Sequence, residues 1–191
     1  MKEFAGQAWN KKKENAPNLV RYIRSFNERS SWFSSIILKA SHLTERVNLI
    51  SKFIEIGLEC AKLKNYSSVF AINASLVSTP VQRLSETFNK LKSKEKKGLE
   101  RLKELTDTSN NFQTLRKLFQ EPPPLLPYIG VLLSDLTFTE DGNKQIVEGP
   151  NKAKFVNFNA KELSAKILKR ILSNIHRRET FDRSENQTIE H

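Results

Sequence analysis

Apolar residues recur every three or four positions along most of this chain, which is the spacing of one face of an α-helix. In residues 17–38 this stripe includes Leu19, Ile23 and Phe26. Pro17 suits the first turn of a helix, because the N–H that proline lacks has no intrahelical partner at that position. We therefore predict a helix over residues 17–38, with a break near Ser30-Ser31.

The same period predicts further helices, separated by proline, glycine and polar clusters. Their expected ranges are 44–64, 66–76, 80–91 with a continuation over 99–105, 112–119, 128–138 and 159–175. Their expected capping residues are Thr44, Ser67 or Ser68, and Asn159. Asp141-Gly142-Asn143 predicts a turn and residues 155–158 a short extended link. No segment alternates convincingly with period two, so the prediction is an all-α fold of roughly eight to ten helices.

Composition places the chain among ordinary globular proteins and gives it a basic surface. Its 191 residues suit one domain, expected to cover residues 1–191. The net charge of +11 favours acidic partners: a nucleic acid, an anionic membrane or an acidic protein surface. Lysines cluster at Lys11-Lys12-Lys13 and over residues 92–97, although solvated helix surfaces also carry such clusters. No apolar run is long enough to span a membrane, so a cytoplasmic location is expected.

Several kinds of chemistry are missing from the sequence. The one cysteine, Cys60, excludes an internal disulfide and falls within an apolar helical stripe. The three histidines are far apart, so a zinc site of ordinary spacing is not expected, and no glycine-rich phosphate loop or nucleophile elbow is present. His42, beside a predicted helix start, suits a surface or capping role better than that of a general base. The residues alone therefore indicate a binding module without a cofactor or metal.

The order of four sequence blocks resembles the catalytic domain of Ras-type guanine nucleotide exchange factors, the domain of the Son-of-sevenless protein. These blocks span most of the chain at family-like spacing. They are Gly6-Gln7-Ala8-Trp9 with Ala16-Pro17-Asn18-Leu19, Phe26-Asn27 and Trp32; Leu43-Thr44-Glu45-Arg46-Val47 with Phe53-Ile54; Asn65-Tyr66, Ser68, Ala71-Ile72, Leu76, Pro80-Val81 and Arg83-Leu84; and Asn111-Phe112, Pro122-Pro123-Pro124, Pro127-Tyr128-Ile129-Gly130, Leu136-Thr137-Phe138, Asp141-Gly142-Asn143 and Phe155-Val156-Asn157-Phe158.

The resemblance implies a helical bowl from which a helical hairpin projects, here over residues 127–172 with its first helix spanning 128–138. In this family the bowl grips the second switch of a small GTPase, and the hairpin wedges the first switch away from the nucleotide. Contacts to magnesium and phosphate are disturbed and the nucleotide leaves, without covalent chemistry. The implied partner is a GTPase of the Ras, Rap or Ral class.

Two sets of residues match the family's contact positions. On the hairpin, Asp141 would repel phosphate oxygens, and Thr137 departs from the leucine that crowds the magnesium site in the Son-of-sevenless protein. Arg24 can pair with acids of the second switch, whereas Phe112 also suits a core position by its spacing. The wedge positions are Tyr128, Thr137, Asp141 and Asn143; the gripping positions are Val20, Ile23, Arg24, Asn27, Thr79, Ser85, Asn111 and Phe112.

Other interpretations stay open at this stage. The chain looks trimmed at both ends relative to the family, with residues 178–191 frayed or truncated. A GTPase-binding module without exchange activity would share every block. A basic nucleic-acid binder would need a recognition helix or interleaved aromatic and basic residues, and neither is found, so no specific nucleic acid is expected. Contact of the lysine clusters with an anionic membrane is compatible with exchange and would recruit the chain there.

Overall fold

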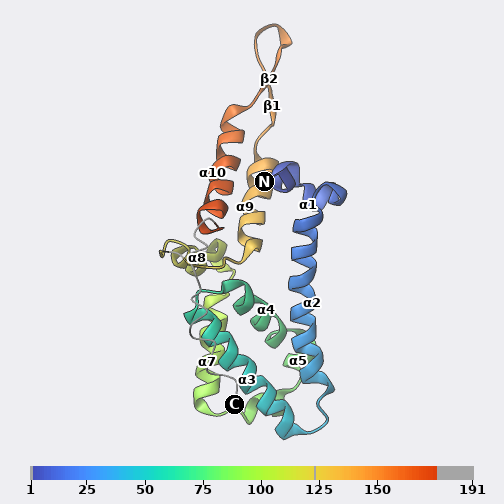
Figure 1. Ribbon diagram of the computed structural model, residues 1–191, viewed down its shortest axis with the longest axis vertical. Helices are drawn as coiled ribbons and strands as arrows, with labels where there is room; N and C mark the ends of the chain where they lie inside the picture. The colour runs from blue at the N-terminus through green and yellow to red at the C-terminus, as the bar shows by residue number, and fades with distance from the viewer. Residues whose placement is uncertain (1, 123, 176–191) are drawn as a thin grey trace, which may run out of the picture.

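The computed structural model describes residues 2–122 and 124–175, most of them in helices (Figure 1). The predicted all-α fold is confirmed, and the described residues form ten α-helices. In chain order the elements are η1 (Lys2–Gln7), α1 (Ala8–Lys11), η2 (Lys13–Asn15), α2 (Pro17–Lys39), α3 (Leu43–Lys62), α4 (Tyr66–Leu76), α5 (Thr79–Gln82), α6 (Ser85–Asn89), α7 (Ser93–Leu105), α8 (Ser109–Leu118), α9 (Ile129–Gly142), β1 (Ile146–Glu148), η3 (Pro150–Lys152), β2 (Lys154–Val156) and α10 (Phe158–Ile175).

The helices form a body and a projecting hairpin (Figure 1). In the body, α4 packs between α2 and α3, and α7 packs against α3 and also contacts α4. The hairpin consists of α9 and α10, which pack on each other and carry the short β1–β2 ladder at the tip. Figure 1 places α2 along the edge of the molecule, with its N-terminal end beside α9 of the hairpin.

The largest apolar cluster lies in the body and joins α2, α3, α4 and α7. Gly57 on α3 allows a close approach of α7, because a Cβ at this position would lie 2.9 Å from Leu102 Cδ1. Cys60 is half-buried and packs against this cluster, and burial raises the pKa of its thiol. The fully or nearly buried members of the cluster are Ile37, Ile50, Phe53, Ile54, Val69, Ile72, Leu76, Val81, Leu91, Leu99, Leu102 and Leu105.

Within the body, the structure corrects several predicted boundaries. Helix α2 has no break at Ser30-Ser31, since Ser34 bonds to Ser30 O and to Ser75 of α4 while the helix continues. Helix α3 begins at Leu43 instead of after a Thr44 cap, with His42 at the N-cap position. Asn65, and not Ser67 or Ser68, caps α4 by accepting the N–H of Ser68.

The segment after Pro80 also differs from its prediction. It forms two short helices, α5 and α6, instead of one helix over residues 80–91. Residues Arg83 and Leu84 separate them. The side chain of Gln82 donates to Leu76 O, which ties α5 back to the end of α4. The longer apolar stripe is therefore divided among separate elements that face one core.

In the hairpin, α9 continues past residue 138 to Gly142, so Asp141 lies in the helix and the predicted turn at 141–143 is wrong. Two of the four residues of the predicted link at 155–158 belong to strand β2, which pairs antiparallel with β1, and Phe158 already begins α10. Asn157 provides the side-chain contact at the start of α10, by accepting the N–H of Ala160, where Asn159 was expected to cap it. The predicted fraying of residues 178–191 lies outside the described residues.

Candidate functional site

Four of the predicted gripping residues line one groove along α2. Val20, Ile23, Arg24 and Asn27 lie on the same face, as expected from their helical spacing. The groove has a volume of about 690 Å³, and residues of α1 and η2 form its end near the hairpin. Trp32 lines it too and is 56% exposed. An exposed tryptophan in a groove is a favourable contact for a protein partner, and the residue-by-residue comparison missed it.

Arg24 is available to a partner at low cost. Its Nε donates to Glu28 Oε1 at 2.7 Å, one turn further along α2. The side chains are 78% and 60% exposed, so the pair contributes little to stability and can be exchanged for another carboxylate. Both residues line the groove.

The other predicted gripping residues lie elsewhere. Thr79 and Ser85 are the first residues of α5 and α6 and are exposed, but neither lines the α2 groove. Asn111 is exposed at the start of α8, where residues 110–112 all have positive φ, between 48° and 57°. The structure therefore unites four of the eight gripping residues in one groove and leaves four outside it.

Phe112 and Tyr128 lie in an aromatic cluster at the base of the hairpin. The Tyr128 ring stacks on Phe70 with centroids 3.9 Å apart, and its centroid lies 5.4 Å from that of Phe26 and 6.4 Å from that of Phe112. Burial raises the pKa of Tyr128. In this chain both residues thus join the hairpin to the body, which agrees with the core interpretation of Phe112.

The other wedge residues lie towards the far end of α9. Thr137 and Asp141 are one turn apart on the helix; Thr137 is half-buried and Asp141 is exposed. The Asp141 carboxylate accepts the Gln7 amide at 2.7 Å and lies 3.4 Å from Lys11 Nζ. The hydrogen bond from Gln7, followed by the charge of Lys11, lowers the pKa of Asp141, so the carboxylate is ionised at neutral pH. Asn143 donates to Thr139 O at 2.8 Å and so caps the end of α9.

One ion pair beside the site could not be found from the sequence. Arg116 of α8 forms a bidentate ion pair with Asp135 of α9: its Nη1 and Nη2 donate to Oδ2 and Oδ1 at 2.9 and 2.6 Å. The same guanidinium donates to the backbone oxygen and the side-chain oxygen of Asn111. Arg116 therefore holds the left-handed turn that presents Asn111, and ties that turn to the hairpin.

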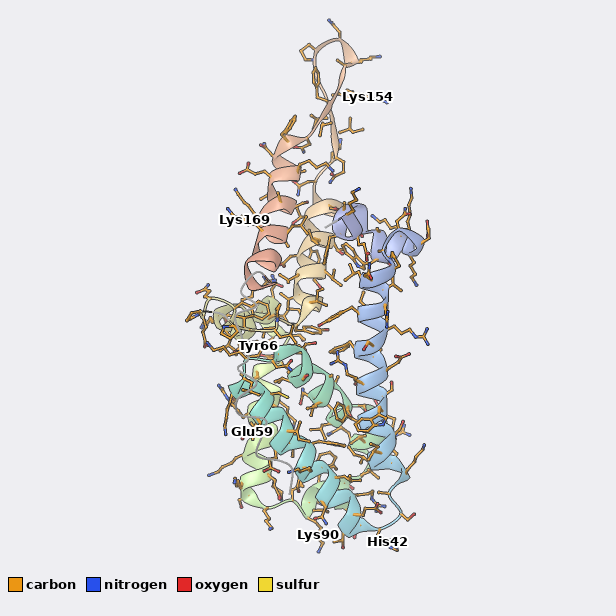
Figure 2. All side chains as sticks on the ribbon, in the orientation of Figure 1. His42, Glu59, Tyr66, Lys90, Lys154 and Lys169 are labelled. Carbon is orange, nitrogen blue, oxygen red and sulfur yellow. The ribbon has the colours of Figure 1, made fainter. Side chains whose placement is uncertain are left out.

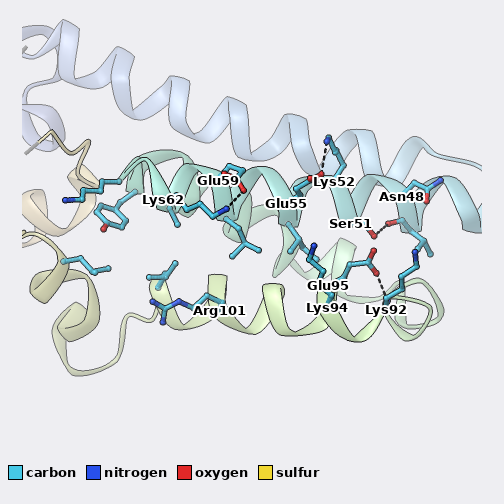
Figure 3. A pocket seen from close by; sticks show the side chains of 18 of the residues that line it. Asn48, Ser51, Lys52, Glu55, Glu59, Lys62, Lys92, Lys94, Glu95 and Arg101 are labelled. Atoms are coloured by element: carbon cyan, nitrogen blue, oxygen red, sulfur yellow. Dashed lines mark hydrogen bonds and ion pairs between the residues drawn. The ribbon is translucent and has the colours of Figure 1, made fainter. Parts of the chain in front are cut away.

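A second groove lies between α3 and α7 and has a volume of about 790 Å³ (Figure 3). Charged side chains line it, and several of them pair along their own helix, as Lys62 does with Glu59 and Lys52 with Glu55. None of the predicted site residues borders this groove. Within residues 2–122 and 124–175, no group of three or more His, Cys, Asp or Glu side chains is placed to hold a metal ion. Among the helices of the same residues, none is both long and apolar enough to cross a membrane.

Comparison with known proteins identifies the family. Residues 1–162 match the family model of the RasGEF domain. The chain is 40% identical over 151 residues to Ras guanine nucleotide exchange factor E of Dictyostelium discoideum, covering 76% of this chain and 15% of that protein. It is 36% identical over 174 residues to factor P of the same organism, covering 89% and 11%, and 38% identical over 136 residues to human Rap guanine nucleotide exchange factor 5, covering 71% and 23%.

The matched region is thus about a tenth to a quarter of the length of these relatives. The family match, in contrast, extends from the N-terminal segment through α9 and the tip of the hairpin into the start of α10. It includes the α2 groove and all four predicted wedge residues. The chain therefore belongs to the RasGEF domain family.

Proposed function

We propose that this chain is a guanine nucleotide exchange factor that releases GDP from a small GTPase of the Ras, Rap or Ral class. The observation that carries the proposal is the position of the α2 groove relative to the hairpin. Residues of α1 and η2 line the end of the groove, and the same N-terminal segment bonds to Asp141 near the end of α9. A partner seated on α2 would therefore have the acidic end of α9 beside it.

In the proposed mechanism the two surfaces act on different parts of the GTPase. The α2 groove holds the second switch, with Val20, Ile23 and Trp32 providing apolar contact and Arg24 a charge for an acidic residue. The hairpin occupies the space of the first switch. The ionised Asp141 then repels the phosphates, and Thr137, one turn earlier, lies towards the magnesium position.

The energetics require both surfaces. A nucleotide bound with nanomolar affinity is held by about 12 kcal/mol, and each tenfold acceleration of its release requires about 1.4 kcal/mol. The exchange factor and the nucleotide weaken each other's binding by the same factor, because binding free energies are reciprocal. A single exposed ion pair contributes about 1 kcal/mol or less, so Arg24 alone cannot supply the coupling. An extended contact that includes the hairpin is needed.

The proposal can be tested by following the release of fluorescent GDP from purified Ras, Rap and Ral proteins with this chain added. We expect faster release from at least one of them and loss of most of the acceleration in Arg24→Glu. Arg29→Glu is the matched control, since Arg29 is also exposed on α2 but does not line the groove. Equal loss in both variants, or no acceleration of any of the three GTPases, would contradict the proposal.

A GTPase-binding module of the same fold without exchange activity is the second candidate. The observation that favours it concerns Asp141: its carboxylate already accepts a hydrogen bond from the Gln7 amide and so is not free to act on the nucleotide alone. This candidate predicts that the chain binds the GTPase through Arg24 but leaves the rate of GDP release unchanged. A binding assay with Arg24→Glu, run beside the release assay, separates the two functions.

Contact with an anionic membrane is a further part of the proposal. The two lysine clusters lie far apart: Lys11-Lys12-Lys13 is where α1 and η2 join, beside the hairpin, and residues 92–97 are at the start of α7 near Lys90, at the end of the body away from the hairpin (Figures 1 and 2). A flat membrane surface that touches this end of the body would not reach the other cluster. Binding to vesicles with and without phosphatidylserine, repeated with each cluster changed to glutamine, would show which end makes contact.

A further inference from the structure

The N-terminal segment of the chain, residues 2–16, joins helix α2 to the hairpin. At one end, Glu3 is fixed to the start of α2, where its carboxylate accepts the N–H of Leu19 and the side-chain amide of Asn18, both at 2.7 Å. Leu19 N–H lies in the first turn of α2 and has no intrahelical partner, so Glu3 supplies one. This contact also places a negative charge at the positive end of the helix dipole.

At its other end the segment is fixed to α9. The N–H of Gly6 donates to Glu140 Oε1 at 3.0 Å, and Gln7 Nε2 donates to Asp141 Oδ1 at 2.7 Å. Gly6 and Gln7 both have positive φ, 64° and 54°, which turns the backbone so that both groups point at α9. Left-handed backbone is unfavourable for glutamine, so the surrounding contacts must hold it in place.

Gln7 is the most buried polar residue of this segment. Only 1% of its surface is exposed, while its side chain reaches across a sequence separation of 134 residues to the hairpin. The residues on either side of Gln7 in the segment belong to an apolar cluster drawn from three parts of the chain. Its members are Phe4, Ala8, Trp9 and Ala16 of the N-terminal segment, Leu19, Val20 and Ile23 of α2, and Ile129, Leu133, Leu136, Ile167 and Leu168 of the hairpin.

We propose that Gln7 is a positioning residue for nucleotide exchange: it fixes the end of α9 relative to the α2 groove. This inference rests on the proposed function for its effect on exchange, but the structural role of Gln7 can be tested without a GTPase. Helix α9 is 14 residues long. At about 1.5 Å per residue, a rotation of 10° at its base moves its end by about 3.5 Å. A displacement of about 1 Å is enough to impair a reaction that depends on position.

The hydrogen bond from Gln7 also selects the oxygen of Asp141 that faces a partner. Because Oδ1 is taken up by Gln7 and Lys11, Oδ2 is the oxygen that can face outward. A chain without the Gln7 amide would keep the negative charge of Asp141, but the orientation of the carboxylate would no longer be fixed. The effect on exchange is therefore expected in the maximum release rate, which depends on the wedge, and not in the concentration for half-maximal rate, which depends on the α2 groove.

The first test measures GDP release as a function of the concentration of this chain. In Gln7→Leu, which removes the donor at similar side-chain size, we expect the maximum rate to fall about tenfold, equivalent to about 1.4 kcal/mol. The half-maximal concentration should change less than twofold. Gln82→Leu is the matched control, since Gln82 also donates one 2.7 Å hydrogen bond but lies in the body. Equal losses in both variants, or a loss confined to the half-maximal concentration, would overturn the proposal.

The second test measures the hairpin directly and requires no GTPase. Spin labels are attached at Arg29→Cys on α2 and Lys152→Cys in the hairpin tip, in a Cys60→Ser background, and electron–electron distances are recorded. Gln7→Leu should broaden or shift the distance distribution by about 3 Å or more, and Gln82→Leu should not.

If Gln7→Leu does not fold, Glu140→Ala serves as the second variant, because it removes the acceptor of Gly6 from a half-buried position. It should move the distance distribution in the same way but by less. An unchanged distribution in the folded variants would show that Gln7 does not position the hairpin. A changed distribution without any exchange activity in the unmodified chain would instead refute the proposed function and leave the structural role standing.

Discussion

Replacing Arg116 with methionine tests how the hairpin is attached to the body. The substitution keeps a long side chain but removes the bidentate ion pair with Asp135 and both hydrogen bonds to Asn111. The Arg116 and Asp135 side chains are only 23% and 17% exposed, so water screens the pair weakly. The hydrogen bond with Asp135 also raises the pKa of Arg116.

The expected loss of stability follows from these contacts. A hydrogen bond to a charged group contributes about 1.5–3 kcal/mol, and removing one partner of a fully buried pair costs about 3–5 kcal/mol. Because Asp135 keeps some access to water, we expect Arg116→Met to lower the free energy of unfolding by about 2–4 kcal/mol. With a urea dependence of about 2 kcal/mol per molar, the unfolding midpoint should fall by about 1–2 M.

Urea unfolding followed by circular dichroism measures this loss. The double variant Arg116→Met with Asp135→Leu is the key comparison, because it removes the carboxylate that the single change leaves unpaired. The double variant should be more stable than Arg116→Met alone, with a coupling energy of about 1 kcal/mol or more. A loss below about 0.5 kcal/mol in the single variant, or purely additive effects, would refute the reasoning.

Three further predictions concern the body and the N-terminal segment. Leu102→Ala should lower the free energy of unfolding by about 2–5 kcal/mol in the same assay, because Leu102 is fully buried between α3 and α7. Thr106→Val should cost about 1–3 kcal/mol despite its similar shape, because the buried Asn73 amide loses its 2.6 Å contact with Thr106 Oγ1. Backbone and side-chain hydrogen bonds lower the pKa of Glu3 below its usual 4.5, so the stability it contributes is complete above about pH 4.5 and is lost as the pH falls through the lowered value. Thermal unfolding of Glu3→Gln should therefore depend less on pH below about pH 5, and an unchanged dependence would contradict this role.

Local signals predicted the helices but not all of their ends. The apolar spacing and Pro17 located the start of α2, because both act within one or two turns of the chain. The break predicted at Ser30-Ser31 was wrong: the helix continues, and Ser34, one turn after Ser30, bonds to Ser75 of α4. The turn predicted at 141–143 began too early in the sequence. Helix α9 packs against the N-terminal segment and α10, and this tertiary packing extends the helix through Asp141.

The candidate site was only partly accessible from the sequence. The family resemblance named Val20, Ile23, Arg24 and Asn27, and helical spacing brings them to one face of α2, so this part of the site could be predicted. The Arg116–Asp135 pair and the Gln7–Asp141 hydrogen bond depend on how distant segments pack, and no local pattern marks them. These long-range contacts determine where the predicted wedge residues lie. The sequence could therefore name the wedge residues but could not predict their positions or hydrogen-bond partners.

The most direct test of the central claim is whether this chain and GDP weaken each other's binding to the same GTPase. The affinity of the chain would be measured for one GTPase in its nucleotide-free and GDP-bound forms. Exchange activity predicts much tighter binding to the nucleotide-free form, with an affinity ratio equal to the factor by which the chain weakens GDP binding. Equal affinity for the two forms would mean that the chain binds without promoting exchange, which would contradict the proposed function.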